Sequence, residues 1–393
     1  MVQARGTTLT AHFDATARGR NTTVPRTALF GIRGRVVNIH GRVMGKKLRV
    51  VLLGIGRMGR NHLRLTSESP DFELVGVVDP VMAARQTSAT GPRFFDDIAA
   101  LQAVEFDAAI VATPTATHRD VVLELVKMKK HVLVEKPIAS SFAQGKEVLQ
   151  AAADAGVKVA VGHVERFNPV VRKLREVIRG GWLGAPIHFS FTRVGGYPET
   201  ILEGNNVLLD LAVHDIDAFR SLVGPVRVEA SMAHSSFRPG VLDTAEIVLE
   251  SAAGPTASVH VNWVTPTKIR TLRVTGTRGV CFMDYILQSC ELHGGNLTKR
   301  IEPSSVENFE SIQEHYRTTD RVVFGVTKEE PLLIQLKQFA AYLRDGDAGE
   351  LCLGEDALAA VLVAERAMQA AARKTERPSA SVRSPVSVDA TWL

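Results

Sequence analysis

Cysteine is scarce in this chain, with only Cys281, Cys290 and Cys352 among 393 residues. No two of them form a CxxC pair, and no histidines stand at zinc-finger spacing. This argues against both a disulfide framework and a structural zinc site, so we expect no bound metal ion. A few unclustered cysteines also fit a protein of the reducing cytoplasm.

The sequence also lacks an apolar run of the roughly 20 residues that a membrane-spanning helix needs. Residues 357–364 are apolar, but the run is short and follows a helical pattern. No internal repeat is visible. With 45% hydrophobic and 23% charged residues, the chain is long enough for two globular domains, and we expect no membrane partner.

Acidic residues are nearly absent from residues 1–43, where seven arginines stand against Asp14 alone. This surplus of +6 exceeds the net charge of +5, so the remainder carries −1 and we expect no nucleic-acid partner. The segment superficially matches an organelle transit peptide, but it lacks the apolar region of a secretory signal. We prefer a mis-assigned start codon, with Met44 as the start, and expect a disordered extension over residues 1–46.

Strand and helix patterns alternate from residue 47 to residue 165. The expected strands are 48–53, 72–79, 108–113, 131–136 and 157–163, with helices at 117–130 and 141–155 between the later ones. Such alternation predicts an α/β fold with a doubly wound parallel sheet, the Rossmann type, over 47–165.

The pattern changes after residue 165. A helix is expected near 169–180, and strand patterns then follow one another from IHFSFTR to VCFMDY. They predict a second, α+β domain over 166–373 with an open, mostly antiparallel sheet. Helices at 331–345 and 355–373 close it, and the polar tail over 374–393 is expected to be disordered.

The sequence GIGRMG at 54–59 follows an expected strand and opens an expected helix. In such a loop Gly54 permits the turn, Gly56 lets the backbone approach a pyrophosphate, and Gly59 lets the helix pack on the strand. Asp79 ends the next strand, where a carboxylate binds the adenosine ribose and repels the 2′-phosphate of NADP. The loop therefore predicts NAD binding, against the alternative of an ordinary glycine turn, although Arg85 keeps the choice over NADP open.

Further cofactor contacts are expected from residues near the carboxyl ends of the strands. They are Arg57, Met58, Thr113, Pro114, His118, Glu135 and Lys136. Glu135 and Lys136 end an apolar strand in HVLVEKP, and Pro137 restricts them to an extended path. In a parallel sheet that end borders the ligand crevice, but a charged pair there is equally typical of a solvated strand end.

A third pattern, VLLDLAVHDIDAFRSL at 207–222, places Asp210, His214 and Asp217 at spacings of four and three. Those spacings put the three side chains on one face of a helix. Taken alone, the pattern is compatible with a buried His-Asp pair, a catalytic pair or a metal site.

Together, GIGRMG, VEKP, DLAVHDID and VTGTRG occur in the order found in the glucose-fructose oxidoreductase, inositol dehydrogenase and rhizopine-catabolism superfamily (Gfo/Idh/MocA). The chain from about residue 47 to residue 373 resembles that family. The resemblance implies a Rossmann domain, a substrate domain and a catalytic Lys, Asp and His at Lys136, Asp210 and His214. Ala212 stands where the family usually has glycine, and Asn205-Asn206 replaces small glycines, which leaves the substrate's shape open.

Oxidation of a secondary alcohol requires a base for the hydroxyl proton and a cation for the oxygen. His214, with an ordinary pKa near 6.5, suits the base. Lys136 suits the cation, and Asp210 would orient the sugar or the base. In some relatives the lysine is the base, so the division between Lys136 and His214 stays open.

Two further stretches, GHVERFNP at 162–169 and WVTPTKIRTLRVTG at 263–276, resemble the UDP-N-acetylglucosamine 3-dehydrogenases. The resemblance implies NAD-dependent oxidation of the C3 hydroxyl of a UDP-sugar, whose product a sugar aminotransferase consumes in lipid A biosynthesis. Expected substrate ligands are His163, Arg166, Asn168, Arg193, Asp210 and His214. Arg166 would contact the sugar and Arg193 the diphosphate, although ordinary surface arginines explain both equally well.

Other functions remain as alternatives. An inositol or other polyol dehydrogenase shares the same fold and motifs. An NAD-retaining glycosidase fits less well because no export signal is visible, and a non-catalytic NAD-binding sensor would lack the Lys136 and His214 pair. We expect a homodimer or homotetramer joined through the second-domain sheet.

Overall fold

The computed structural model describes residues 46–83, 92–196, 198, 205–294, 310, 313 and 320–375, together with strands β1 (Phe30–Ile32) and β2 (Arg35–Val37). The chain divides into two compact units, residues 1–46 and residues 47–393. In the first unit β1 and β2 pair antiparallel, which the sequence did not predict. Most of the expected extension and tail, and Arg85, lie outside the described residues.

Within the described part of the second unit, seven strands form one sheet in the order β17-β8-β7-β6-β3-β4-β5. Six are parallel: β3 (Leu48–Leu53), β4 (Phe72–Val78), β5 (Arg93–Phe95), β6 (Ala108–Val111), β7 (His131–Glu135) and β8 (Val159–Gly162). Numbered along the chain, these six follow the order 3-2-1-4-5-6 of a Rossmann domain. The doubly wound sheet is therefore confirmed.

Helices cover both faces of this sheet, so its central strands contain continuous apolar runs, such as Val50 to Leu53 of β3 and Val132 to Val134 of β7. The helices of this part are α1 (Arg57–Glu68), α2 (Pro80–Ala83), η1 (Ala99–Ala103), α3 (Thr115–Lys127) and α4 (Phe142–Ala155). One face packs on α1 and on α8 (Pro331–Asp345), and the other packs on α3, α4 and α9 (Gly354–Thr375). The Ser141 side chain caps α4 by accepting a hydrogen bond from the Gln144 backbone N–H.

A second sheet of eight strands has the order β10-β11-β12-β9-β13-β14-β15-β16 among the described residues. Its strands are β9 (Pro186–Val194), β10 (Val226–His234), β11 (Thr244–Ser251), β12 (Thr256–Asn262), β13 (Ile269–Gly276), β14 (Gly279–Asp284), β15 (Ser289–Gly294) and β16 (Arg321–Phe324). All neighbours pair antiparallel except β12 and β9, so the expected open, mostly antiparallel sheet is confirmed.

Alternation along these strands separates a covered face from an open face. The inner side chains pack against α5 (Pro169–Arg179), α6 (Val213–Val223) and α9. A 3-10 turn, η2 (Val164–Phe167), leads from β8 into α5. On the outer face Val248, Ile269 and Phe282 are exposed.

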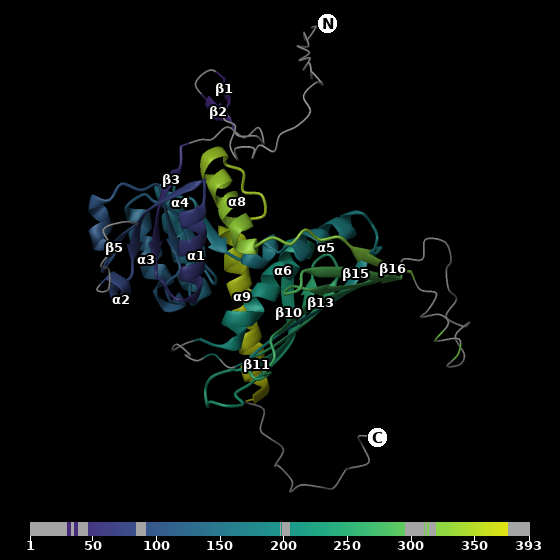
Figure 1. The fold of residues 1–393 in the computed structure, drawn as a ribbon. Coiled ribbons are helices and arrows are strands. Elements are labelled where there is room, and N and C mark those ends of the chain that lie inside the picture. The colour runs from purple at the N-terminus through teal and green to yellow at the C-terminus, as the bar shows by residue number, and fades with distance from the viewer. Residues whose placement is uncertain are drawn as a thin grey trace, which may run out of the picture. The chain divides into compact units, whose positions relative to one another are not determined.

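The chain returns to the first sheet after the second sheet is complete. Leu336 and Phe339 of α8 join the core on one face, and β17 (Cys352–Leu353) pairs antiparallel with β8 at the edge. Helix α9 then contributes to the cores of both sheets, between which it lies (Figure 1). The division at residue 165 stays a prediction, and it does not include this return. None of the described helices has the length and apolar character needed to cross a membrane.

Candidate active site

The glycines of the 54–59 loop meet three different steric demands. Gly54 has φ +86°, and a Cβ there would lie 2.8 Å from the Ala112 carbonyl oxygen. A Cβ on Gly59 would lie 2.1 Å from the Gly54 carbonyl oxygen, so only glycine allows α1 to pack here. Gly56 instead borders open space at the start of α1, whose N-terminus has no side-chain cap. An uncapped helix N-terminus with room beside it fits the pyrophosphate of a dinucleotide.

Asp79 is held beside this loop by two backbone groups. Its Oδ2 accepts a hydrogen bond from the Ile55 N–H at 2.8 Å, and its Oδ1 accepts one from the Val81 N–H at 3.0 Å. The carboxylate thus stands at the end of β4, where the ribose of a dinucleotide bound to the loop is recognised in Rossmann domains. Arg57 and Met58 begin α1 at the same loop.

The turns after β6 and β7 are joined through His118. Its ring nitrogens lie 2.8 Å from the Pro137 carbonyl oxygen and 2.9 Å from the Thr113 carbonyl oxygen. Burial lowers the pKa of His118 although both carbonyl acceptors act to raise it. His118 therefore braces the turn that contains Thr113 and Pro114, and direct cofactor contact by these three residues stays a prediction.

Lys136 reaches from the end of β7 to the second domain. Its Nζ donates to the Asp210 carbonyl oxygen at 2.7 Å and to Asp210 Oδ1 at 3.0 Å, while Trp263 Nε1 donates to Oδ2 at 3.3 Å. Burial opposes ionisation of Asp210, but the charge of Lys136 outweighs it and lowers the pKa of Asp210. The structure thus brings together two of the three catalytic residues expected from the sequence, 74 positions apart.

His214 lies where a π-helical turn, η3 (Leu208–Ala212), passes into α6. Burial, followed by the positive charge of Lys136, holds the pKa of His214 well below its ordinary 6.5. Its Nδ1 is buried and has no hydrogen-bond partner among the described residues. A neutral imidazole beside a charged lysine can accept a proton at neutral pH. Turns of the π type are frequent at functional sites.

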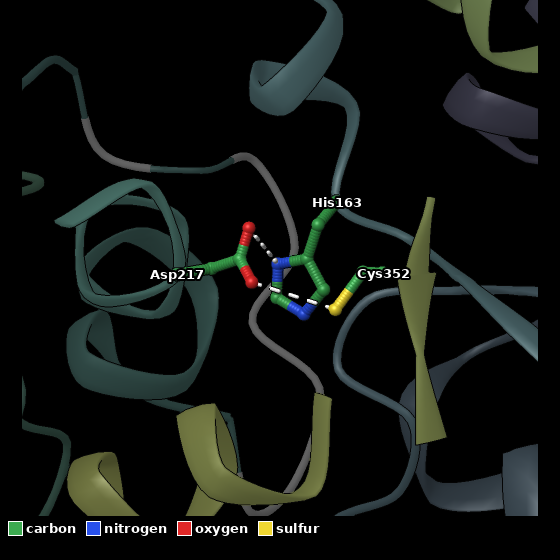
Figure 2. A group of neighbouring side chains, drawn as sticks. All are labelled: His163, Asp217 and Cys352. Carbon is green, nitrogen blue, oxygen red and sulfur yellow. Dashed lines mark hydrogen bonds and ion pairs between the residues drawn. The ribbon is translucent and has the colours of Figure 1, made fainter. Parts of the chain in front are cut away.

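Asp217 belongs to a separate buried group at the end of β8. Figure 2 shows His163, Asp217 and Cys352 together, with one ligand atom of each lying within 4.8 Å of the others. These side chains suit a metal ion by type. However, Arg166 donates to both oxygens of Asp217 at 2.7 and 2.8 Å. This guanidinium already neutralises the carboxylate and would repel a metal ion beside it, so the group does not fit a metal centre.

Comparison with known proteins identifies the family. Residues 48–163 match the oxidoreductase family's NAD-binding Rossmann fold, and residues 171–281 match the Gfo/Idh/MocA C-terminal domain. The chain is 30% identical to scyllo-inositol 2-dehydrogenase (NAD(+)) of Bacillus subtilis (strain 168), over 61% of this chain and 75% of that protein. The chain belongs to the Gfo/Idh/MocA family. This Gfo/Idh/MocA member is an NAD-dependent sugar or polyol dehydrogenase that acts on a CH–OH group.

Two further Gfo/Idh/MocA relatives cover more of the chain. Inositol 2-dehydrogenase of Rhizobium meliloti (strain 1021) is 28% identical over 84% of this chain and 98% of that protein. UDP-N-acetylglucosamine 3-dehydrogenase GnnA from Acidithiobacillus ferrooxidans has a similar structure, with a TM-score of 0.68 at 21% identity. That likeness spans 83% of this chain and 98% of the solved one, and it shows the shared fold.

Four expected substrate ligands of this Gfo/Idh/MocA enzyme are buried in contacts of their own. Arg193 donates to Asp215 through Nε and Nη2 and to Glu165 through Nη1. Asn168 caps α5 and donates to the Tyr285 carbonyl oxygen. The four residues are His163, Arg166, Asn168 and Arg193, each at most 5% exposed. Their role as substrate ligands stays a prediction, whereas Asp210 contacts Lys136 directly and His214 feels its charge.

His62, which was not predicted as a site residue, lies on the buried face of α1. Its Nε2 donates to Glu135 Oε1 at 2.7 Å, and both side chains are buried. Burial opposes ionisation of Glu135, but His62 and the adjacent Lys136 outweigh it and lower the pKa of Glu135. This contact ties the cofactor-loop helix to the strand end that carries Lys136. Its signal in the sequence is a histidine three residues after Gly59, one turn into the helix that follows the glycine loop.

Proposed function

We propose that this dehydrogenase oxidises the C3 hydroxyl of a UDP-sugar, with UDP-N-acetylglucosamine as the first candidate substrate. Its proposed catalytic residues are Lys136, Asp210 and His214. The observation that carries the chemistry is the contact between Lys136 and Asp210 beside a neutral His214. NAD, when bound, supplies the hydride acceptor. The substrate assignment rests on the stretches GHVERFNP and WVTPTKIRTLRVTG.

The three residues divide the work on the hydroxyl group. His214, neutral at pH 7, accepts the hydroxyl proton, and the Lys136 ammonium stabilises the negative charge that develops on the oxygen. Asp210 holds the ammonium in place from across the crevice. We place the enzyme in the cytoplasm, with a sugar aminotransferase consuming its keto product. The homodimer or homotetramer expected from the sequence stays a prediction.

Inositol is the second candidate substrate. Both sequence relatives described above are named inositol dehydrogenases, and one of them matches 84% of this chain. A cyclic polyol presents the same secondary hydroxyl to Lys136 and His214. The two candidates differ in charge, because only the UDP-sugar carries a diphosphate.

The substrate is tested by turnover with trapping of the product. We expect NADH to form with UDP-N-acetylglucosamine when a sugar aminotransferase and glutamate remove the ketone, since the equilibrium disfavours a free ketone. Absorbance at the NADH band measures this, with myo-inositol and scyllo-inositol assayed in parallel. Turnover of an inositol with none of the UDP-sugar under trapping would replace the first candidate by the second.

Cofactor choice is tested at Asp79. We propose that this carboxylate recognises the adenosine ribose, so Asp79→Ser should weaken NAD binding about tenfold and improve the ratio of NADP to NAD binding. Fluorescence titration of both cofactors measures the change. Asp96, exposed in a nearby turn, supplies the control Asp96→Ser. An unchanged preference in Asp79→Ser would mean that other residues select the cofactor.

A further inference from the structure

Arg270 occupies an unusual position on the covered face of the second sheet. It lies on β13 two residues before Leu272 and four before Val274, both of which are buried in the core. The strand register places Arg270 directly opposite Arg193 of β9. Like charges directly opposite each other destabilise a sheet, so this arrangement needs a compensating interaction.

Arg193 is bound directly to carboxylates, but Arg270 is not. Asp215 and Glu165 are bound to Arg193, and Asp210 is bound to Lys136 and Trp263. In the described part of the chain Arg270 forms no ion pair, and its Nη1 is buried without a hydrogen-bond partner.

The electrostatic surroundings lead to the same conclusion. Burial and the charge of Arg193 lower the pKa of Arg270 to about 10. Asp215, Glu165 and Asp210 act in the opposite direction, so the guanidinium is charged at neutral pH although none of these carboxylates is bound to it.

Arg270 lies within electrostatic reach of the proposed catalytic residues. The charge of Arg270 contributes to the lowered pKa of His214, and Arg270 in turn feels the carboxylate of Asp210. The side chain is only partly buried, so part of the guanidinium is accessible. A planar guanidinium binds phosphate or carboxylate through two parallel hydrogen bonds.

We propose that Arg270 binds an anionic oxygen group of the substrate, a phosphate or a carboxylate, and thereby selects charged sugars over neutral polyols. The inference rests on the proposed catalytic role of Lys136, Asp210 and His214 and adds the residue that sets substrate class. Among the described residues, Arg193 and Arg270 are arginines whose charge acts on His214, and Arg193 is bound to a buried carboxylate.

The test compares Arg270→Gln and Arg270→Lys with Arg273→Gln, an exposed arginine on the opposite face of the same strand. We expect Arg270→Gln to raise KM for UDP-N-acetylglucosamine about 10- to 100-fold, the loss of a charged hydrogen bond. Arg270→Lys should recover part of this, and Arg273→Gln should match the wild type. NAD binding should stay unchanged. The melting temperature of Arg270→Gln should not fall, because repulsion from Arg193 is removed.

Calorimetric titration with UDP and with glucuronate separates the two anions. Weaker binding of UDP alone assigns the phosphate, and weaker binding of glucuronate alone assigns the carboxylate. If Arg270→Gln binds both as the wild type does and its KM is unchanged, the inference is wrong while the proposed function stands. If the wild type oxidises inositol but not the UDP-sugar, and Arg270→Gln still loses glucuronate affinity, the proposed function fails; anion binding by Arg270 then stands, but its selection against neutral polyols does not. If the wild type binds neither UDP nor glucuronate, both the inference and the proposed function are wrong.

Discussion

Replacing Lys136 with methionine is expected to lower kcat by about a hundredfold or more, the range for losing an oxyanion donor or a general base. The side chain keeps its length but loses the ammonium that contacts Asp210. NAD affinity should persist, because the glycine loop and Asp79 are untouched. Stopped-flow measurement of NADH formation gives kcat, and fluorescence titration gives cofactor affinity. Lys127→Met, at an exposed lysine on α3, is the matched control.

His214→Gln should cause a loss of similar size if His214 is the base. Because burial and neighbouring cations lower the pKa of His214, its neutral form persists below pH 6.5, and the wild-type kcat should not decline between pH 8 and 6.5 through protonation of this group. His260→Gln, on the second sheet, is the control. If Lys136→Met abolishes turnover while His214→Gln retains most of it, the lysine is the base.

Breaking the buried pair of Arg166 and Asp217 is expected to have the largest effect on stability. Removing one partner of a buried ion pair leaves an uncompensated charge and costs about 3–5 kcal/mol. Arg166→Met should therefore lower the free energy of unfolding by about that much, as measured by urea denaturation. Arg166→Met combined with Asp217→Leu should recover most of the loss, because the orphaned charge is gone.

The pair of Arg166 and Asp217 should also make the free energy of unfolding depend on pH in the acid range. Burial opposes ionisation of Asp217, but His163 and Arg166 outweigh it and lower its pKa below the ordinary 3.8. A carboxyl with a lowered folded pKa stabilises the protein fully above its unfolded pKa and loses that contribution as the pH falls through the folded value. Wild-type stability should thus fall more steeply below pH 4 than that of the double variant. Parallel slopes would show that Asp217 is not the group responsible.

The strands could be predicted from the sequence wherever burial on both faces requires an unbroken run of apolar residues. Val50 to Leu53 and Val132 to Val134 are buried on both faces, and an unbroken apolar run is the sequence mark of that position. The glycine loop was predictable because Gly54 and Gly59 meet local steric demands, while Gly56 leaves room beside the helix N-terminus. Lys136 and Asp210 required the family resemblance, since no local pattern shows that residues 74 apart will meet.

What escaped prediction depends on distant contacts. Arg166 and Arg193 look like substrate ligands in the sequence, yet their carboxylate partners stand 51 and 22 residues away. The two-residue strand β17 is too short to show a period, and it exists only because β8 offers an edge. The π-helical turn at Asp210 similarly leaves no periodic trace in an otherwise helical pattern.

Because α8 and β17 follow the whole second sheet in the chain, the ribosome completes the first sheet only after it has made the second. A ribosome adding about 5–20 residues per second needs on the order of ten to thirty seconds to pass from residue 165 to residue 331. During that interval the nascent Rossmann sheet has no β17 on the edge of β8 and no α8 over one face. The part of its apolar surface that α8 covers in the finished protein is then still exposed. A message cut after residue 330 would yield an unfinished nucleotide domain, not a smaller working one.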